Sequence, residues 1–490
     1  MTKYRNALEL DFNGTNFSPE EWPDYKYVLK NMSSSVIEEL FDFRYYFGYG
    51  VYPSPVVEAH VRDENSSSQH DIKGGDRLSR ATDFFVERKY AQKALSILLS
   101  QNFSGVGVYQ NSVYNGEKDK WTMFHVDTRI DDEEVAVVDT VKNSHIDSYL
   151  QNIEDTLGGR HPDYLIINHM GPDHSGSIKS MREAFPDMKI VGNAKTMNFL
   201  EGFYGITEGT KVIEDGDELD LGSRTLKFYL TPMVHWPETM MTFDQKDKIL
   251  FAGDAFGGFG SLNGYLFDDE VNVDHFKDEI RRYFSNIIGK YGPVVHNTIS
   301  RLRNEIEEIE MIASTHGLVW REDPAHIIAE YDKWSQQHTE EGVVVVYGSM
   351  YGNTKVMAEA VARSLSENGI EQIRLFDVSR KDISFIINDI WKYKGIVLGS
   401  CTYNTDIFPP MEYLLKSLES RNLKDRVLGI FGSYSWSGGA LDRLEEFSET
   451  VSCNLAEPVI ESQFAPGGDI LEKCYLLGEN VAKKVKENCK

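Results

Sequence analysis

From about residue 105 onward, short apolar segments alternate with turn residues. The segments EVAVVDT, DYLIINH, KIVG and KILFAGD end at a polar residue or a glycine, namely Asp139, His169, Gly192 and Asp254. The segment IKSMREAF, which lies between the second and the third of them, has helical spacing. This alternation predicts a layered α/β domain whose functional groups emerge where strands stop.

Two further segments have the pattern of amphipathic helices. In FFVERKYAQKALSILLSQN, residues 84–102, apolar positions recur three and four residues apart. In ISRLRNEIEEIEMIA, residues 299–313, charged residues occupy the positions expected to be exposed. We therefore expect a helix in each segment.

A regular alternation of strands and helices begins near residue 340, where we place a domain boundary. The segments VVVVYGS, IRLFDVS, KGIVLGS and VLGIFGS follow one another, with helical segments between them. Repeated βαβ order predicts a parallel sheet that is covered by helices on both faces.

The composition narrows the class of protein. The chain has 490 residues, of which 41% are hydrophobic and 26% charged, as expected for two or three globular domains. A formal net charge of −26 argues against nucleic acid and acidic lipid as partners and favours a small basic or neutral redox partner. No apolar run is long enough to span a membrane. The N-terminus lacks a secretory pattern and the four cysteines form no C-x-x-C pair, so we expect a cytoplasmic protein.

The first strand after residue 340 leads into a loop suited to phosphate. The loop combines hydroxyls and backbone N–H groups at the start of a helix, where a phosphate dianion binds without a lysine. It contains neither a Walker A motif nor the G-x-G-x-x-G fingerprint of dinucleotide sites. A mononucleotide is therefore the expected ligand.

Two later strand ends have similar loops, rich in hydroxyls, glycine and aromatic residues. Alone, such a turn is usually a helix cap, but three at successive strand ends favour a ligand site. Their amides and hydroxyls can bind the polar edge of an isoalloxazine ring, while Tyr403 or Trp436 covers its faces. The candidate flavin-binding residues are Ser349, Met350, Tyr351, Gly352, Asn353, Thr354, Ser400, Cys401, Thr402, Tyr403, Asn404, Ser433, Tyr434, Ser435, Trp436, Ser437 and Gly438.

Potential metal ligands follow four of the earlier strands. The stretch INHMGPDHSG, residues 167–176, is the densest group, and its two histidines are five residues apart, which suits a sharp loop. A single histidine after a strand is usually structural, but this cluster is harder to explain in that way. Imidazole and carboxylate ligands without a thiolate suit iron, manganese or zinc, and an aspartate can bridge two ions. The candidates are His169, Asp173, His174, His235, Asp254 and His316.

With these motifs in place, the chain resembles a flavodiiron protein (A-type flavoprotein). Residues from about 130 to 321 resemble the metallo-β-lactamase fold, and about 145 later residues resemble flavodoxin, whose FMN phosphate loop matches S-M-Y-G-N-T. The family motifs N-H-x-E-x-D-H-S-G, T-P-x-x-H-W-P, D-A-F-G and S-x-H-G recur here in order, except at one position. The resemblance implies an α/β fold: an αββα sandwich followed by a doubly wound parallel sheet.

The resemblance also implies a site and an activity. His169 and His235 would hold one iron, Asp173, His174 and His316 the other, and Asp254 would bridge them. Asp139 would orient one of these metal-binding side chains without binding metal itself. FMN would pass electrons from rubredoxin, another small donor or a reduced coenzyme to the two irons, which reduce dioxygen to water, nitric oxide to nitrous oxide, or both. Members of the family form head-to-tail homodimers, or dimers of such dimers, in the cytoplasm.

The resemblance also sets the expected domains. Residues 105–335 would form the metal-binding domain and residues 342–490 the flavin-binding domain. The opening strands of the family are hard to find before residue 105, so residues 1–104 are either an extension or a divergent version of the first sheet.

The exception to the family motifs is Gly171, which stands where the family has a glutamate ligand. Without that carboxylate, the first iron would keep only two histidines and Asp254, and would bind more weakly. Water could fill the vacancy, or the first site could be empty or hold zinc. We expect two irons, the first of them weakened.

Two other functions fit parts of the sequence. A hydrolase of the β-lactamase superfamily would use Asp173 to orient or deprotonate a zinc-bound water, but a fused flavin domain has no role in hydrolysis. An electron-transferring flavoprotein with a degenerate metal site would explain Gly171. The retention of His235, Asp254 and His316 argues against such decay.

Overall fold

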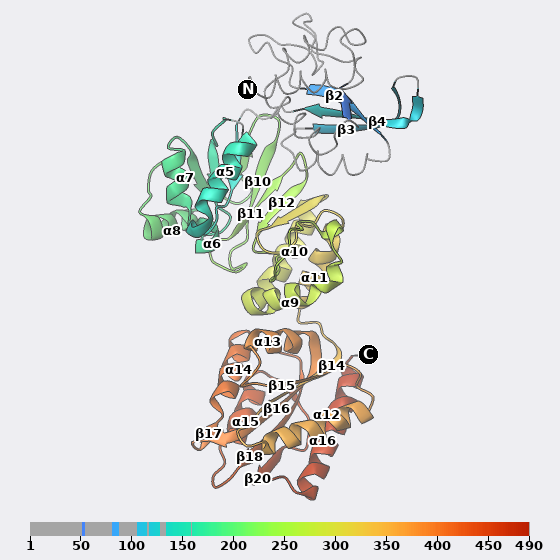
Figure 1. Ribbon diagram of the computed structural model, residues 1–490. Helices are drawn as coiled ribbons and strands as arrows, with labels where there is room; N and C mark the ends of the chain where they lie inside the picture. The colour runs from blue at the N-terminus through green and yellow to red at the C-terminus, as the bar shows by residue number, and fades with distance from the viewer. Residues whose placement is uncertain are drawn as a thin grey trace, which may run out of the picture. The chain divides into compact units, whose positions relative to one another are not determined.

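The computed structural model describes residues 134–157 and 159–489, and the backbone of four earlier strands. The chain divides into two compact units, of which the first comprises Met1–Val135 and Asp147–His161 and the second Ala136–Ile146 and Pro162–Lys490. Figure 1 shows the described elements of both units.

The first unit contains an antiparallel sheet with the strand order β1-β2-β4-β3. Its strands are β1 (Val51–Pro53), β2 (Ala81–Glu87), β3 (Gly105–Tyr114) and β4 (Glu117–Asp127). Most of helix α5 (Ile146–Leu157) also belongs to this unit.

The helix predicted over residues 84–102 is wrong at its start, because residues 84–87 belong to strand β2. Aromatic and β-branched residues favour strands, and the backbone register of β2 and β4 sets Phe84 opposite Phe124 and Phe85 opposite Met123. The rest of that segment lies outside the described residues.

The second unit begins with two sheets packed face to face. The first is parallel, in the order β5-β6-β7-β8, and the second has the order β13-β12-β11-β10-β9. Buried residues of both sheets, such as Ile166, Val191, Leu226 and Phe228, form one hydrophobic cluster between them. The strands are β5 (Ala136–Val138), β6 (Tyr164–Ile166), β7 (Lys189–Gly192), β8 (Thr210–Val212), β9 (Glu218–Asp220), β10 (Thr225–Leu230), β11 (Met240–Asp244), β12 (Ile249–Gly253) and β13 (Met311–Ser314).

Helices lie on both sides of this pair of sheets, with α7 and α8 opposite α10 and α11 (Figure 1). Such an arrangement is the expected αββα layering, in which each sheet buries one face against the other and one against helices. The helices are α6 (Pro172–Ser175), α7 (Ile178–Ala184), α8 (Ala194–Tyr204), α9 (Lys277–Tyr283), α10 (Gly292–Glu305) and α11 (Pro324–Ser335), with short turns at Asn143–His145, Asp268–Glu270, Val273–His275, Phe284–Ile288 and Gly289–Tyr291.

The helix predicted over residues 299–313 is only partly right. Helix α10 ends at Glu305, and residues 311–314 form strand β13, which pairs in parallel with β12. The backbone of Ile306 is already extended, so the helical spacing of the last apolar residues is incidental. Strand pairing with β12 decides their conformation.

A doubly wound parallel sheet follows, with the order β15-β14-β16-β18 and a fifth position shared by β19 and β20. In chain order this is the 2-1-3-4-5 arrangement of flavodoxin-like folds. The strands are β14 (Glu340–Gly348), β15 (Ile373–Asp377), β16 (Tyr393–Tyr403), β17 (Asp406–Ile407), β18 (Val427–Tyr434), β19 (Asn454–Leu455) and β20 (Ile460–Gln463). The helices are α12 (Asn353–Glu367), α13 (Ile383–Lys392), α14 (Pro409–Ser420), α15 (Ala440–Thr450) and α16 (Gly468–Asn488).

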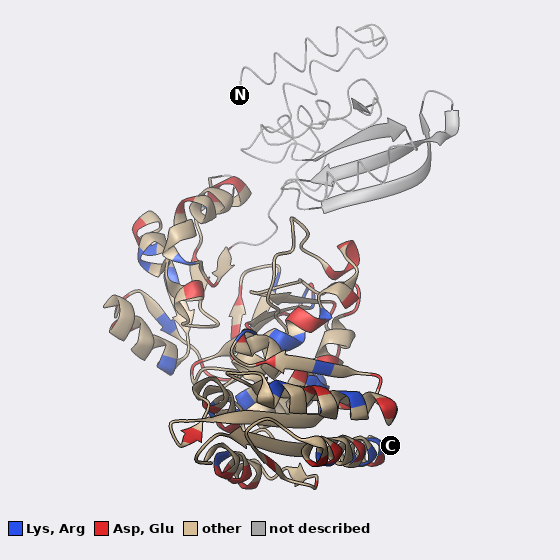
Figure 2. Cartoon of the chain, turned by 60° about the horizontal axis from the view of Figure 1, so that its bottom comes forward, with Lys and Arg blue, Asp and Glu red and all other residues tan. Residues whose placement is uncertain are grey.

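The run of four valines in β14 shows why this sheet needs helices on both faces. Val343 and Val345 pack with α12 and α16 in one core, whereas Val344 and Val346 pack with α13, α14 and α15 in another. Strand side chains alternate between faces, so a strand buried on both sides is apolar throughout. The central strands β16 and β18 accordingly contain a single charged residue, Lys394, and the charged residues in Figure 2 gather mainly on the helices.

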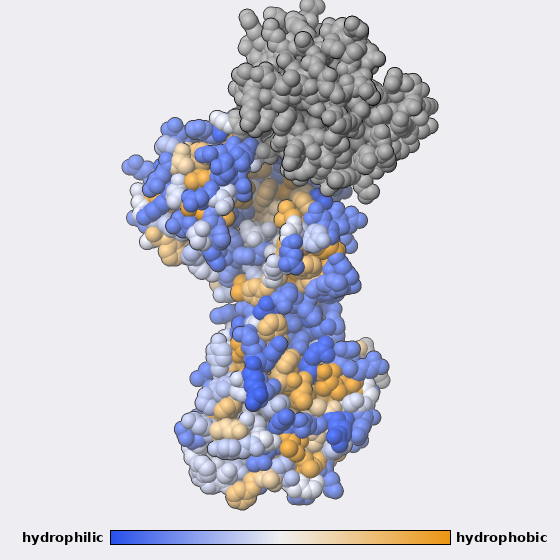
Figure 3. All heavy atoms as spheres, viewed as in Figure 1, coloured by the Kyte–Doolittle hydropathy of each residue, from blue (hydrophilic) through white to orange (hydrophobic). Residues whose placement is uncertain are grey.

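The described surface is largely hydrophilic on the face shown in Figure 3, with hydrophobic residues in small groups. Among the described residues, no helix combines the length and the apolar character that a membrane span needs.

Candidate metal centre and flavin site

The loop after β6 is as sharp as its sequence predicts. His169 lies three residues beyond the strand, and the short helix α6 carries Asp173 and His174. Pro172 starts this helix, and the His174 N–H group donates to the Gly171 carbonyl over 2.8 Å. One tight turn thus directs three potential ligands toward the ends of the neighbouring strands.

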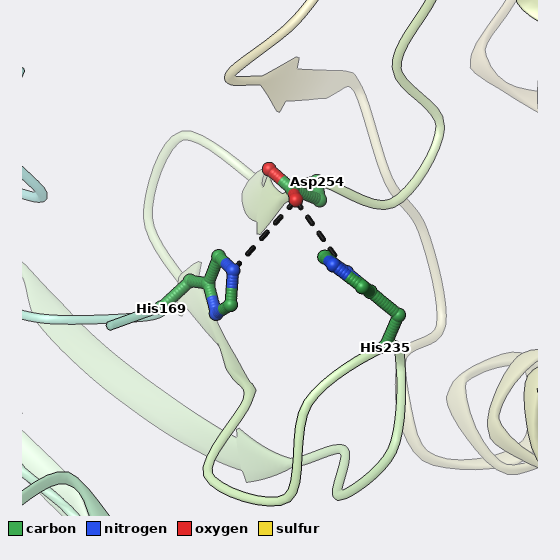
Figure 4. A group of neighbouring side chains, drawn as sticks. All are labelled: His169, His235 and Asp254. Atoms are coloured by element: carbon green, nitrogen blue, oxygen red, sulfur yellow. Dashed lines mark ion pairs between the residues drawn. The ribbon is translucent and has the colours of Figure 1, made fainter. Parts of the chain in front are cut away.

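The six predicted ligands come together as two groups of three. His169, His235 and Asp254 form the first group, and Asp173, His174 and His316 form the second. Within each group, the potential ligand atoms lie within 4.8 Å of one another. Figure 4 shows the first group, in which both imidazoles point at the Asp254 carboxylate.

The Asp254 carboxylate joins the two groups because its oxygens face different histidines. Oδ2 lies 3.8 Å from His169 Nε2 and 3.5 Å from His235 Nδ1. Oδ1 lies 2.8 Å from His174 Nε2 and 3.3 Å from His316 Nε2. His316 Nε2 is also 3.3 Å from Asp173 Oδ2. This is the placement that a bridging carboxylate requires.

Charge and burial fit two cations at this position. Buried polar atoms normally have hydrogen-bond partners, yet buried His235 Nδ1 has none among the described residues. The remaining ligand atoms are imidazole nitrogens and carboxylate oxygens, a set that suits iron or zinc. The residues present therefore fit a pair of metal ions.

The pKa shifts in the metal-free protein report how tightly these groups interact. Burial raises the pKa of Asp254, but hydrogen bonds from His174 and His316 bring it well below its usual range. A hydrogen bond from His316 is the main cause that lowers the pKa of Asp173 to about 2. Burial lowers the pKa of His235. Perturbed groups of this density are typical of functional sites.

Asp139 lies beside the ligand loop, as predicted, but it contacts backbone. Its Oδ1 accepts hydrogen bonds from the N–H groups of Asn168, over 2.8 Å, and His169, over 3.3 Å. Burial is the main cause that raises its pKa to about 6. Asp139 thus holds the chain at the start of the loop, and an effect on the His169 ring stays a prediction.

Two residues near the ligands were missed by sequence analysis. Glu238 is fully buried, with Oε1 2.8 Å from His169 Nδ1. Tyr283 is also buried, and its ring lies 5.5 Å from that of His316. Burial and the neighbouring Asp254 carboxylate raise the pKa of Tyr283 well above its usual range. Glu238 follows His235 by three residues, which was a usable signal, whereas Tyr283 lies in a helix without a motif.

Gly171 lies between two ligands. Its backbone φ of −51° is available to any residue, so the glycine is not needed for conformation. A Cβ atom there would lie 2.7 Å from His169 Nε2 and 2.9 Å from Asp173 Oδ1. The His169 ring therefore occupies space that a side chain at position 171 would need.

Two backbone segments, at Gly258 and at His316–Gly317, are in direct contact close to the second ligand group. The Gly258 N–H group donates to the His316 carbonyl over 3.1 Å. A Cβ on Gly317 would lie 2.8 Å from the Gly258 nitrogen, and Gly317 has a positive φ of 76°. This contact fixes the loop after Asp254 against the loop that carries His316.

The three hydroxyl-rich loops form one cavity of about 180 Å³ at the carboxyl ends of the parallel strands. Ligands bind at this edge in doubly wound sheets. Thr405 also lines the cavity and was not predicted, whereas Gly352, Ser400 and Gly438 do not line it. The predicted residues that line it are Ser349, Met350, Tyr351, Asn353, Thr354, Cys401, Thr402, Tyr403, Asn404, Ser433, Tyr434, Ser435, Trp436 and Ser437.

Hydrogen bonds shape the phosphate loop before any ligand binds. The Gly352 N–H group donates to Ser349 Oγ over 3.0 Å, and Thr354 Oγ1 lies 2.8 Å from Ser433 Oγ. Gly352 has a φ of 95°, which lets the chain turn into helix α12 at Asn353. Tyr351 and Trp436 are 88% and 83% exposed, so their rings are free to cover a planar ligand.

The fold and the two sites define a class of protein: a two-metal αββα sandwich joined to a mononucleotide-binding flavodoxin-like sheet. Comparison with known families agrees, since residues 125–317 match the ODP family beta lactamase and residues 345–478 match Flavodoxin.

Several known proteins are similar to this chain over most of their length. The anaerobic nitric oxide reductase flavorubredoxin of Escherichia coli O1:K1 / APEC is 31% identical over 358 residues, which cover 72% of this chain and 74% of the relative. The structure of rubredoxin oxygen:oxidoreductase from Desulfovibrio gigas is 26% identical, with a TM-score of 0.71 over 73% of this chain and 90% of that one. The flavodiiron protein from Giardia intestinalis is 28% identical, with a TM-score of 0.68 over 74% and 88%. The chain belongs to the flavodiiron protein family, and the predicted family and fold class are confirmed.

Proposed function

We propose that this protein is a flavodiiron oxidoreductase that passes electrons from FMN to two irons and reduces dioxygen, nitric oxide or both. The observation that carries the proposal is the Asp254 carboxylate, whose two oxygens face two separate ligand groups. The names of the relatives, a nitric oxide reductase and an oxygen oxidoreductase, support the same chemistry. We assign the metals to residues 105–335 and the flavin to residues 342–490.

When bound, the irons would supply electrons and coordination positions for the substrate, and FMN would supply further electrons. His169 and His235 would hold one ion, Asp173, His174 and His316 the other, with Asp254 shared. Tyr283 has an ordinary pKa of 10.0, which burial and Asp254 raise further, so it keeps its phenolic proton at neutral pH and can offer a hydrogen bond to a ligand held there.

At the flavin site, the loop at the start of helix α12 would bind the FMN phosphate through backbone N–H groups and the hydroxyls of Ser349 and Thr354. The exposed rings of Tyr351, Tyr403 and Trp436 would cover the isoalloxazine. FMN fits this cavity better than a dinucleotide because the loop lacks the glycines of a dinucleotide turn.

The first metal site should be the weaker one because Gly171 contributes no carboxylate. We infer that it still binds iron, since His169, His235 and Asp254 remain together. A rubredoxin or another small electron donor, a head-to-tail homodimer or a dimer of dimers, and a cytoplasmic location remain predictions from the family resemblance.

Gly171 also favours one alternative, an electron-transferring flavoprotein whose metal site has decayed. The two functions differ in metal content and in turnover. We would load the full chain anaerobically with ferrous iron and FMN, count both per chain, and follow NADH-driven consumption of dioxygen and nitric oxide with a rubredoxin and its reductase present.

The proposed function predicts two irons and one flavin per chain, with consumption of at least one of the two gases. Flavin reduction without iron binding or gas consumption would establish the electron-transferring alternative instead. Two metals with hydrolytic but no reductive turnover would point to a hydrolase, which the flavin domain does not favour.

A further inference from the structure

Glu238 is a carboxylate buried with little to neutralise it. It is 0% exposed, and its Oε1 lies 2.8 Å from His169 Nδ1 and accepts the Met170 N–H over 3.0 Å. Oε2 has no hydrogen-bond partner among the described residues. Burying a carboxylate is costly unless a donor or a cation faces it. The donor that faces Glu238 is a proposed metal ligand.

The contact fixes which ring nitrogen of His169 can bind a metal. Oε1 accepts the Met170 N–H, so it also acts as the acceptor toward the ring, and Nδ1 therefore carries the proton and donates it to Glu238. Nε2 is then left with a free lone pair, and it is the nitrogen that faces Asp254, at 3.8 Å. The His169 ring also contacts the ring of Trp236, which meets it edge-on with a centroid distance of 5.1 Å.

We propose that Glu238 is a positioning residue that holds His169 with Nε2 toward the first metal and supplies the negative charge that Gly171 does not. This inference rests on the proposed metal centre. A carboxylate behind a ligating imidazole fixes its tautomer and raises its basicity as a ligand. The Glu238 charge would reach the metal only through the His169 ring, because Oε1 contacts Nδ1, whereas Nε2 is the nitrogen that faces Asp254.

Glu238 and Gly171 also depend on each other sterically. A Cβ at position 171 would lie 2.7 Å from His169 Nε2, so the ring would have to move. Glu238 holds the other nitrogen of that ring and resists the movement. The backbone of Glu238 is held in turn, because its carbonyl accepts a 2.6 Å hydrogen bond from Asn193 Nδ2.

The test compares Glu238→Ala and Glu238→Gln with the wild type in the full chain containing FMN. Ferrous iron is titrated anaerobically against a competing chelator, which gives an affinity for each of the two ions. Glu238→Ala should lower the affinity for the weaker ion by roughly 10- to 100-fold, the usual effect of removing such a partner, and change that for the other far less. Glu238→Gln should have a smaller effect, because its amide oxygen still accepts from Nδ1 but carries no charge.

A matched control separates this role from packing. Thr239 is the next residue, is 4% exposed, and donates to the Thr231 carbonyl through Oγ1 at 2.5 Å. Thr239→Val should leave both iron affinities unchanged. If Thr239→Val weakened iron as much as Glu238→Ala does, the role of Glu238 would be structural only.

A second readout does not depend on iron. In ¹⁵N-histidine-labelled metal-free protein, His169 should be the Nδ1–H tautomer in the wild type and in Glu238→Gln, and a mixture of tautomers in Glu238→Ala. This comparison keeps the test decisive if Glu238→Ala folds poorly, because Nε2–H in the wild type would overturn the inference.

The outcomes separate this inference from the proposed function. A wild type that binds fewer than two irons would defeat the metal centre itself. A wild type with two irons, together with Glu238 variants of unchanged affinity, would defeat only the role of Glu238.

Discussion

The proposed metal centre and the proposed flavin site of this protein are built in opposite ways. The proposed metal centre gathers side chains from positions 169 to 316, of which half are buried and the others partly buried, and they lie close to one another. The proposed flavin site uses three runs of nearly consecutive residues, many of them exposed. Backbone and hydroxyl groups from all three runs would bind the flavin. One substitution should therefore damage the metal centre severely, whereas the flavin site should lose affinity in small steps.

The largest expected effect comes from Asp254→Ala, which removes the carboxylate shared by both ligand groups. Iron affinity should fall by more than roughly 100-fold, which is the upper end of the loss caused by mutating residues that only hydrogen-bond to a ligand. FMN binding should stay unchanged. Iron and flavin contents per chain measure both. Asp244→Asn is the matched control, since Asp244 is also buried but pairs with Arg224. Loss of FMN from Asp254→Ala would contradict the independence of the two sites.

Gly171→Ala should have the next largest effect. The added Cβ would press on His169 Nε2 and Asp173 Oδ1, and overpacking of about 1–3 kcal/mol corresponds to a roughly 5- to 160-fold weaker first metal. Gly171→Glu adds the same Cβ together with a carboxylate, so it should bind the first metal more tightly than Gly171→Ala. Chelator competition measures both variants. Equal affinities would show that a carboxylate at this position reaches no metal.

Thr354→Val tests the flavin site. It removes the hydroxyl that lies 2.8 Å from Ser433 Oγ at the start of helix α12. Loss of one such bond, about 0.5–1.5 kcal/mol, should weaken FMN by a factor of roughly 2 to 13 without changing iron content. Fluorescence titration of the flavin-free protein measures the affinity. Ser417→Ala, which changes an exposed hydroxyl on α14, should bind FMN as the wild type does.

The smallest effect concerns the stability of the metal-free protein. Burial lowers the pKa of His316, but the hydrogen bonds that its ring donates to Asp173 and Asp254 raise it to about 9, above the usual 6.5. Because the folded state binds this proton more tightly, its contribution to the free energy of unfolding is complete below about pH 6.5 and is lost as the pH rises through about 9.

Urea unfolding of metal-free protein across that range should therefore show a decline in stability that is shallower in His316→Gln. His145→Gln, a change at an exposed histidine, should retain the decline. A decline of equal steepness in His316→Gln would assign it to other groups.

Sequence patterns could predict the parts of the site that follow strand ends. His169, Asp254 and the phosphate loop each come directly after an apolar run, so their position in the fold follows from local order. The approach of Tyr283 to Asp254 depends on how helix α9 packs, which no local pattern encodes. The contact of Glu238 with His169 joins residues 69 positions apart.

The two incorrect helices have a related cause. Residues 84–87 and 311–314 have apolar residues at helical spacing, but each segment pairs with a strand distant in sequence. A short apolar run is compatible with either period, and the partner strand decides. The strand predicted at the valine run agrees with β14, because the length of the run and its flanking turns leave no room for a helix.

The backbone crossing between Gly258 and Gly317 constrains how such a centre can diverge. A fold of this kind can persist when a metal ligand is replaced, since Gly171 stands where the family motif has a glutamate. A side chain at Gly317 has no comparable freedom, because it would strike the backbone of Gly258 at 2.8 Å and shift the loops of Asp254 and His316 together. In descendants of this protein, the glycines at the crossing should therefore outlast individual metal ligands, and a search for remote relatives should weight them accordingly.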